Sequence, residues 1–83
     1  MFYIYILKSL KDGKFYIGQT SNIEERLIRH NEGREKATKN RRPFKLIHKE
    51  EFQTRTEALK REKDLKSLKS HNQILILINT SVG

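Results

Sequence analysis

The sequence predicts a small α+β domain that covers residues 1–83. Three observations support this fold class: short apolar runs joined by an Asp-Gly pair, two patterns of Ser or Thr followed three residues later by Glu, and the lack of repeats or linkers. A chain of this length has the size of one domain, and such a domain buries only about 60% of the surface that its unfolded chain exposes. We therefore expect a thin core in a single domain.

The strands are predicted from three apolar runs. Residues 2–7 are all aromatic or aliphatic, which suits a strand covered on both faces, and residues 15–17 form a second run. The Asp-Gly pair at 12–13 is a strong turn signal, so these two runs should form an antiparallel hairpin. After a proline, residues 44–48 predict a third strand that continues toward Phe52.

Alternation along a strand decides which side chains share a face. In the first strand, one face would hold Tyr3, Tyr5 and Leu7, and the other would hold Phe2, Ile4 and Ile6. In the second strand, Tyr16 and Gly18 share a face. The register between the strands is open at this point, and so is the question of which faces coincide.

A first helix is predicted between Ser21 and Gly33. Ser21 and Glu24 have the spacing of a capping box, and Gly33 is a natural stop. Arg26 and His30 are four residues apart and are therefore neighbours on one side of this helix. The apolar residues expected to face the core are Ile23, Leu27 and Ile28.

A second helix is predicted beyond residues 34–42, which are basic, lack periodicity and indicate a loop. Thr54 and Glu57 form a second capping box, and the helix should extend over residues 58–68. Residues 72–78 fit either a short third helix or an edge strand, because their Ile-Leu alternation does not settle the period. The side chains expected on the buried side of the second helix are Ala58, Leu59, Leu65 and Leu68.

The composition favours a polyanionic partner. Eighteen Lys and Arg against ten Asp and Glu give a formal net charge of +8. Nucleic acid is the commonest partner of such a chain, although excess charge can also serve solubility alone. The basic residues are spread over several elements, which disfavours binding to a membrane surface.

The same composition argues against several classes of protein. The chain has no cysteine and only three scattered histidines, so disulfides and a structural zinc site are not expected. Residues 2–5 are apolar without a preceding basic segment, which does not fit a signal peptide. The longest apolar run, residues 74–78, is far shorter than the ~20 residues that span a bilayer. We expect a soluble cytoplasmic protein.

Glu62 is the most informative single position. It stands inside the apolar stripe of the second helix, so helical geometry aims its carboxylate at the sheet. A buried carboxylate requires compensation by a cation or by good hydrogen bonds. Two partners are open: Arg26 or another basic side chain in an ion pair, and a Mg²⁺-like ion, which prefers hard oxygen ligands.

Two tyrosines and a glycine on neighbouring strands could also carry chemistry. Tyr5 and Tyr16 fit either ordinary sheet aromatics or catalytic phenols. A phenol has an ordinary pKa of about 10 and acts as a base near neutral pH only where cations favour the phenolate. Arg26, His30 and a bound metal would supply such an environment. Gly18 could let a phosphate or an ion approach the backbone, or it could mark a bulge or strand end.

Basic side chains provide candidate contacts to phosphate. Arg26 can present a planar fork to a phosphate, and its alternative is a solvated helix face. His30 could order a hydroxyl or donate to phosphate, and its alternative is an exposed histidine at a helix end. The side chains that fit either a clamp on backbone phosphates or a solvated loop are Lys36, Lys39, Arg41 and Arg42.

Together these positions resemble the GIY-YIG nuclease family, which is named for two strand motifs. Here the motifs read Tyr3-Ile4-Tyr5 and Tyr16-Ile17-Gly18. The resemblance continues through residues 26–30, 42–43 and 57–63, covers nearly the whole chain, and is greatest to the small single-domain bacterial branch. Tyr3 stands where the family name has glycine, a substitution familiar in that branch.

The resemblance implies a small three-stranded antiparallel sheet flanked by helices, with the site on one sheet face, and an endonuclease that uses one Mg²⁺ or Mn²⁺ ion. Tyr16 would be the general base for the attacking water, and Tyr5 would orient groups by hydrogen bonding. Arg26 would neutralise the scissile phosphate, and His30 would support the nucleophile. Glu62 would bind the single metal that stabilises the leaving oxygen.

Three functions are therefore weighed. The first is an endonuclease acting on DNA rather than RNA, in repair, recombination or mobile-element processing. So small a domain has little surface for reading sequence, which favours structure-selective cutting or targeting by a partner protein. The second is a non-catalytic nucleic-acid-binding module on the same fold, and the third is a protein-interaction domain whose charge is incidental.

Overall fold

The computed structural model describes residues 1–68 and 71–81. Its elements follow one another in the order β1 (Phe2–Ser9), β2 (Phe15–Thr20), α1 (Ile23–Asn31), a short 3₁₀ helix η1 (Lys39–Arg41), β3 (Phe44–Phe52), α2 (Arg55–Lys66) and α3 (His71–Ser81). The three strands form one sheet in the order β2-β1-β3, and both pairings are antiparallel. The α+β fold with a three-stranded antiparallel sheet is confirmed.

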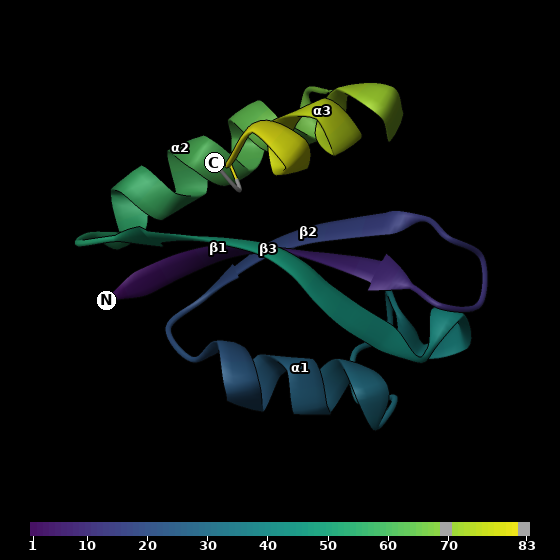
Figure 1. Cartoon of the computed structure of the whole chain (residues 1–83). Coiled ribbons are helices and arrows are strands. Elements are labelled where there is room, and N and C mark those ends of the chain that lie inside the picture. The colour runs from purple at the N-terminus through teal and green to yellow at the C-terminus, as the bar shows by residue number, and fades with distance from the viewer. Residues whose placement is uncertain (69–70, 82–83) are drawn as a thin grey trace.

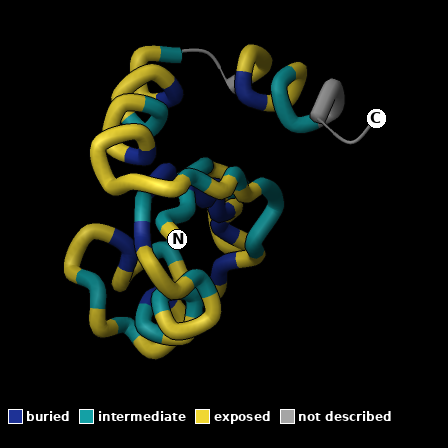
Figure 2. The backbone as a smooth tube through the Cα atoms, turned by 90° about the vertical axis from the view of Figure 1, so that its left-hand side faces the viewer, coloured by how far each residue is buried: buried dark blue, intermediate teal, exposed yellow. Residues whose placement is uncertain are grey.

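The sheet separates two helical layers. In Figure 1, α2 and α3 lie on one side of the sheet and α1 lies on the other. Because β1 is the central strand, its side chains face one layer and then the other along the chain. Figure 2 shows buried positions concentrated in the strands and recurring singly along the helices, as a thin two-sided core requires.

Each face of the sheet carries its own apolar cluster. The α2 and α3 side contains Ile4 and Ile6 of β1, Ile17 of β2, and Ala58, Leu65 and Ile74 of the two helices. The α1 side contains Tyr5, Leu7 and Phe44, against which Tyr16, Ile23, Leu27 and Leu46 pack. The alternation predicted for β1 is confirmed for these residues.

The hairpin between β1 and β2 turns at the predicted Asp-Gly pair. Gly13 has a φ of +74°, in the region where glycine is favoured because it has no Cβ. The strands extend further than the apolar runs indicate, since β1 continues to Ser9 and β2 to Thr20. The register pairs Tyr5 with Gly18 and Leu7 with Tyr16, so the Tyr5 and Tyr16 faces coincide.

The start of α1 differs by one residue from the prediction. Ser21 is not the N-cap; the Asn22 side chain accepts a hydrogen bond from the Glu25 backbone N–H at 3.1 Å. An amide oxygen caps as well as a hydroxyl, and here Asn22 has the extended backbone that an N-cap requires. At α2 the predicted cap is confirmed, because Thr54 accepts from the Glu57 N–H at 3.2 Å.

One further detail corrects the sequence-based expectations, and two others complete them. Ile28 and Leu59 were expected in the core, but they are 53% and 45% exposed, because the stripe of each helix that meets the sheet is narrower than the apolar pattern. Residues 34–42 contain η1 within the predicted loop. The segment 72–78, left between helix and strand, belongs to α3.

Within the described ranges, no helix has both the length and the apolarity needed to cross a bilayer.

The capping of α1 yields a stability test. We expect Asn22→Ala to lower the free energy of unfolding by about 1 kcal/mol, because it leaves a helix N–H without its partner. Ser21→Ala should change it by less than about 0.5 kcal/mol, because Ser21 is an exposed neighbour that does not cap the helix. Urea unfolding of both variants measures the difference, and equal losses would contradict the assignment of the cap.

Candidate active site

The Tyr5 phenol lies buried at the centre of the α1 side of the sheet. Its side chain is only 2% exposed, and its ring occupies the space beside its strand partner Gly18. A Cβ built on Gly18 would lie 2.6 Å from Cζ of Tyr5, which is closer than real Cβ atoms approach another atom. Glycine at this position therefore makes room for Tyr5, and not for a phosphate or an ion as the sequence suggested.

His30 connects Tyr5 to the loop that follows α1. Its Nε2 lies 3.0 Å from the Tyr5 hydroxyl, and its Nδ1 lies 2.7 Å from Oγ1 of Thr38. His30 and Thr38 are both fully buried, so the exposed helix-end histidine considered above is wrong. The Thr38 hydroxyl also donates to the Glu35 carbonyl at 3.5 Å, a long contact.

One arrangement of protons satisfies all of these contacts. If the Thr38 hydroxyl donates to the carbonyl of Glu35, its oxygen accepts the Nδ1–H of His30. The Nε2 of His30 then accepts the proton of the Tyr5 hydroxyl. In this assignment Tyr5 is held as a donor toward His30, and its oxygen still has a lone pair for a further contact.

The surroundings keep both groups neutral near pH 7. Burial raises the pKa of Tyr5 well above its ordinary value, and the nearby Tyr16 adds to this, while the Arg26 guanidinium opposes it only in part. Burial also lowers the pKa of His30, against the attraction of Glu35. Tyr5 is thus a poor base, and His30 is an uncharged hydrogen-bonding link.

Tyr16 lies beside this buried pair but is differently placed. Its ring centroid is 5.0 Å from that of His30 and 6.4 Å from that of Tyr5. It is half-buried on the edge strand β2. Among residues 1–68 and 71–81 we find no hydrogen bond to its hydroxyl, whereas the Tyr5 hydroxyl is engaged. Tyr16 is therefore the phenol with its oxygen available to a substrate.

Arg26 brings a positive charge to the Tyr5 phenol. Its side chain is 32% exposed, and its Nη1 lies 3.9 Å from Oε1 of Glu35, a long ion pair. Arg29 makes the shorter contact to the same oxygen, at 3.0 Å. Because Arg29 already balances Glu35, the Arg26 charge is largely uncompensated and can attract a phosphate.

Glu62 belongs to the other helical layer, so the expectation that the site lies on one sheet face is wrong for this residue. Its side chain is 18% exposed, and its Oε2 pairs with Nζ of Lys66 at 2.9 Å. Of the alternatives considered for this carboxylate, the structure contains an ion pair, with Lys66 and not with Arg26. α2 packs on β1 and β2 from the face opposite α1, so Glu62 and Tyr16 can approach each other only around the β2 edge.

The residues around Glu62 fit one type of metal ion. No group of three or more His, Cys, Asp or Glu side chains is gathered anywhere in the described part of the chain. This rules out a cage of protein ligands there but suits Mg²⁺, which keeps most of its waters and binds through one or two carboxylates and substrate phosphates. The Lys66 ammonium that balances Glu62 is 54% exposed and can be displaced at little cost.

The predicted phosphate clamp divides into two kinds of residue. Lys36, Lys39 and Arg42 are exposed. Arg41 instead binds other parts of the protein. Its Nε donates to Oδ2 of Asp12 at 3.2 Å, and its Nη2 donates to a backbone carbonyl of β2. The expectation that Arg41 grips a phosphate is therefore corrected, because its guanidinium is already committed to the hairpin.

Sequence reasoning missed Thr38 and Glu35. Thr38 lies in a stretch without periodicity, where nothing marks a single threonine as buried, and Glu35 reads as one more charge in a polar loop. Their roles depend on how the loop folds back onto α1. A buried histidine at position 30 would have required a partner for each ring nitrogen, which is the only signal that could have prompted a search.

A family model for the GIY-YIG catalytic domain matches residues 1–74. The chain belongs to the GIY-YIG family. Its motif residues Tyr5, Tyr16, Arg26 and His30 are those gathered on the α1 side of the sheet, and this family is a family of nucleases. A GIY-YIG domain also indicates nucleic acid as the binding partner.

Similar proteins occur in several bacteria. A UPF0213 protein of Staphylococcus saprophyticus is 45% identical over 90% of this chain and 92% of its own length. One of Listeria welshimeri is 44% identical over 92% of this chain and 84% of its own length. The solution NMR structure of a UPF0213 protein from Bacillus halodurans has a TM-score of 0.61 and 34% identity, covering 96% of this chain and 85% of that one.

The His30 link yields a second test. Thr38→Val removes the hydroxyl that serves Nδ1 of His30, and we expect a loss of about 1–3 kcal/mol in the free energy of unfolding, because a buried polar atom loses its partner. Thr38→Ser is the control, since it keeps the hydroxyl, and it should retain most of that stability. Urea unfolding measures both, and the ¹⁵N chemical shifts of the His30 ring report the tautomer. A wild-type His30 that carries its proton on Nε2 rather than on Nδ1 would contradict the proton arrangement given above.

Proposed function

We propose that this chain is a metal-dependent endonuclease that hydrolyses phosphodiester bonds in DNA, with Tyr16 as general base and one bound metal ion. The observation that carries the proposal is the pairing of a hydrogen-bonded, buried Tyr5 with a nearby Tyr16 whose hydroxyl is free. Phosphodiester hydrolysis needs an activated water and charge neutralisation at one phosphate. The α1 side of the sheet offers groups suited to both.

The two tyrosines are suited to different tasks. Tyr5 holds its proton, because burial raises its pKa and His30 accepts its hydrogen bond, so its task is to position neighbouring groups. Tyr16 has its hydroxyl free and lies on an edge strand, where it would act as a phenolate that takes a proton from the attacking water and becomes a neutral phenol. General-base catalysis of this kind contributes about 10²–10⁴-fold to a rate.

Arg26 and His30 complete this side of the site. The Arg26 guanidinium, only distantly paired with Glu35, would hold the scissile phosphate and neutralise part of its charge. His30 would keep Tyr5 in place through its neutral ring. Each of these tasks needs a fixed side chain, and the buried contact between His30 and Tyr5 supplies that rigidity.

Glu62 would hold the metal, Mg²⁺ or Mn²⁺. When bound, the ion supplies Lewis-acid stabilisation of the negative charge that develops on the leaving oxygen. Glu62 suits this task because its partner is a flexible, half-exposed lysine that can give way to a cation. A single carboxylate supports a one-metal mechanism rather than a two-metal clamp.

The choice of DNA and of targeting belongs to the same proposal. The chain has 83 residues and little surface for reading base edges, which favours structure-selective cutting or delivery by a partner protein. A non-catalytic nucleic-acid-binding module on this fold is the second candidate. It would use the exposed Lys36, Lys39 and Arg42 but would have no need of a free phenol beside Tyr5 and His30.

Removal of the metal or its ligand tests the proposal directly. We expect the wild type to cut branched or duplex DNA with Mg²⁺ or Mn²⁺ and to stop cutting when a chelator is added. Glu62→Gln should abolish cutting at every metal concentration. Asp64→Asn, a neutralised carboxylate two residues along the exposed part of α2, should cut like the wild type. Metal-independent binding without any cutting, in the wild type, would establish the binding module instead.

Substitution of the free phenol tests the base. We expect Tyr16→Phe to lower the single-turnover cutting rate by about 10² or more, because it removes the general base and leaves the ring. Tyr3→Phe is the matched control, since Tyr3 is a half-buried tyrosine of the same sheet outside the cluster, and its rate should stay near that of the wild type. A Tyr16→Phe rate within a few-fold of wild type would assign the base elsewhere.

A further inference from the structure

The positive charge of this chain is concentrated at one end of the sheet. We define the cationic end as residues 8–14, which form the β1–β2 turn, and residues 36–45, which lead from the loop after α1 into β3. The turn holds three lysines and one aspartate, and the second segment holds five Lys or Arg and no acid. Together they carry a net +7 of the chain's +8.

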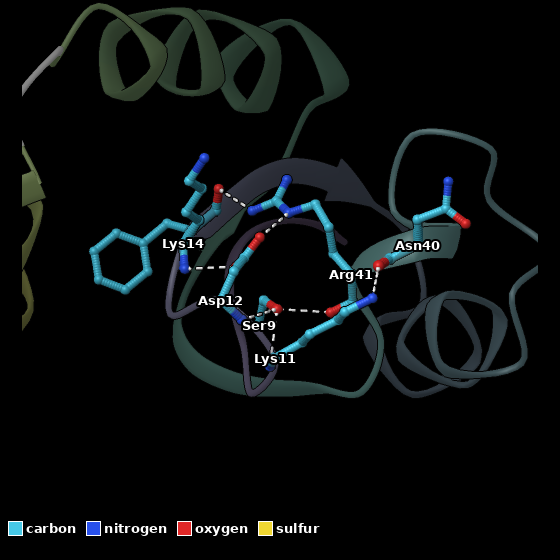
Figure 3. A network of polar contacts seen from close by, with 7 residues as sticks. Ser9, Lys11, Asp12, Lys14, Asn40 and Arg41 are labelled. Atoms are coloured by element: carbon cyan, nitrogen blue, oxygen red, sulfur yellow. Dashed lines mark hydrogen bonds and ion pairs between the residues drawn. The ribbon is translucent and has the colours of Figure 1, made fainter.

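The two segments form one structural unit (Figure 3). The buried Ser9 hydroxyl donates to the carbonyl of Arg41 at 2.6 Å and accepts from two backbone N–H groups of the turn. Arg41 pairs with Asp12, and Nζ of Lys11 donates to the carbonyl of Asn40 at 3.1 Å. The turn is therefore fixed against η1, and the lysines of both segments share one frame.

The ion pair within the cationic end neutralises little of its positive charge. Asp12, the single acid of the cationic end, is paired with Arg41. Glu32 and Glu35, the nearest acids before it in the chain, are paired with arginines outside it, Arg34 and Arg29. Within residues 1–68 and 71–81, the side chains of the cationic end that are exposed and have no carboxylate partner are Lys8, Lys11, Lys14, Lys36, Lys39, Arg42 and Lys45.

Two of these lysines oppose each other directly. Lys8 on β1 pairs with Lys45 on β3 in the sheet register, and like charges in such a pair destabilise it. The cationic end therefore retains a repulsion that a bound anion would relieve. A need for solubility alone would be met by spreading the same charges over the surface.

The cationic end also lies next to the cluster formed by Tyr5, Tyr16 and His30. Arg41 donates to the carbonyl of Phe15, the residue before Tyr16, and Thr38 lies between Lys36 and Lys39 while it bonds the buried His30. A phosphate backbone that lies along the cationic end would thus pass close to β2, the strand that carries Tyr16.

We propose that the β1–β2 turn and residues 36–45 together form a two-part docking surface for the phosphate backbone of nucleic acid, which positions the strand beside Tyr16. This inference rests on the proposed function and deepens it. It adds Lys8, Lys11, Lys14 and Lys45 to the phosphate contacts that the sequence indicated. Arg41 is not one of these contacts, because its hydrogen bonds join the two parts of the surface.

The test compares variants that each lose two exposed positive charges. Lys11→Gln with Lys14→Gln changes the turn, Lys36→Gln with Lys39→Gln changes the second segment, and Lys49→Gln with Lys60→Gln is a control pair outside the cationic end. Binding to a fluorescently labelled DNA duplex is measured by anisotropy, in the presence of chelator, between about 50 and 200 mM salt. Thermal melts check that every variant is folded.

We expect the turn pair and the second-segment pair each to lower the slope of log K against log salt by about two, one for each lost phosphate contact. The control pair should leave this slope unchanged. An equal loss in the control pair would overturn the proposal, because the charge would then act without a defined surface. A slope unchanged by the turn pair would remove the turn from the surface and would also overturn it.

Two further comparisons distinguish this proposal from membrane binding and from the proposed nuclease activity. Vesicles of phosphatidylglycerol should bind weakly and with no dependence on the turn pair, and tight vesicle binding without duplex binding would overturn the nucleic-acid assignment. Since chelator prevents metal-dependent cutting, these measurements do not depend on catalysis. A wild type that binds as described but never cuts with Mg²⁺ would refute the proposed nuclease and leave the docking surface intact.

Discussion

The hydrogen bonds of the buried His30 ring are the constraint on which the site depends. A ring nitrogen with no partner in the interior costs about 1–3 kcal/mol, so both nitrogens of His30 must be served. Tyr5 serves one from the central strand, and Thr38 serves the other from the loop. Through one side chain of α1, the sheet, the helix and the loop are thus fixed relative to one another. The absent side chain of Gly18 completes this arrangement, because only glycine leaves space for the Tyr5 ring.

The loop after α1 links the site to the charged end of the molecule. Thr38 holds one end of it against His30, and Arg41 and Ser9 hold the other against the hairpin. These ties are made by side chains that bind other parts of the protein. Their lysine neighbours in the sequence are left exposed, so one short segment both orders the interior and presents charge outside.

The extent to which the sequence predicts this structure depends on whether a feature is local. The Asp-Gly turn, the Thr54 cap and the alternation of Tyr5 with Ile4 and Ile6 are local patterns, and all are confirmed. The cap at Asn22 was missed because Ser21 satisfies the same pattern one residue earlier. The buried state of His30 and the tie from Arg41 depend on contacts between residues far apart in the chain, which periodicity cannot reveal. The motif resemblance named Tyr5, Tyr16, Arg26 and His30, which the structure gathers on the α1 side of the sheet, but not the reason for Gly18 or the part played by Thr38.

In the mechanism that we propose, the site would draw residues from both helical layers of the fold. The phenols and Arg26 belong to the α1 side of the sheet, while the carboxylate belongs to α2 on the other side. In a sheet of three strands, groups from both layers could approach one phosphate at the β2 edge, because β2 is both an edge strand and the strand that carries Tyr16. A phosphate held at this edge would lie where the two layers adjoin. In a wider sheet the same residues would be separated by intervening strands, so the proposed mechanism would require a sheet as narrow as this one.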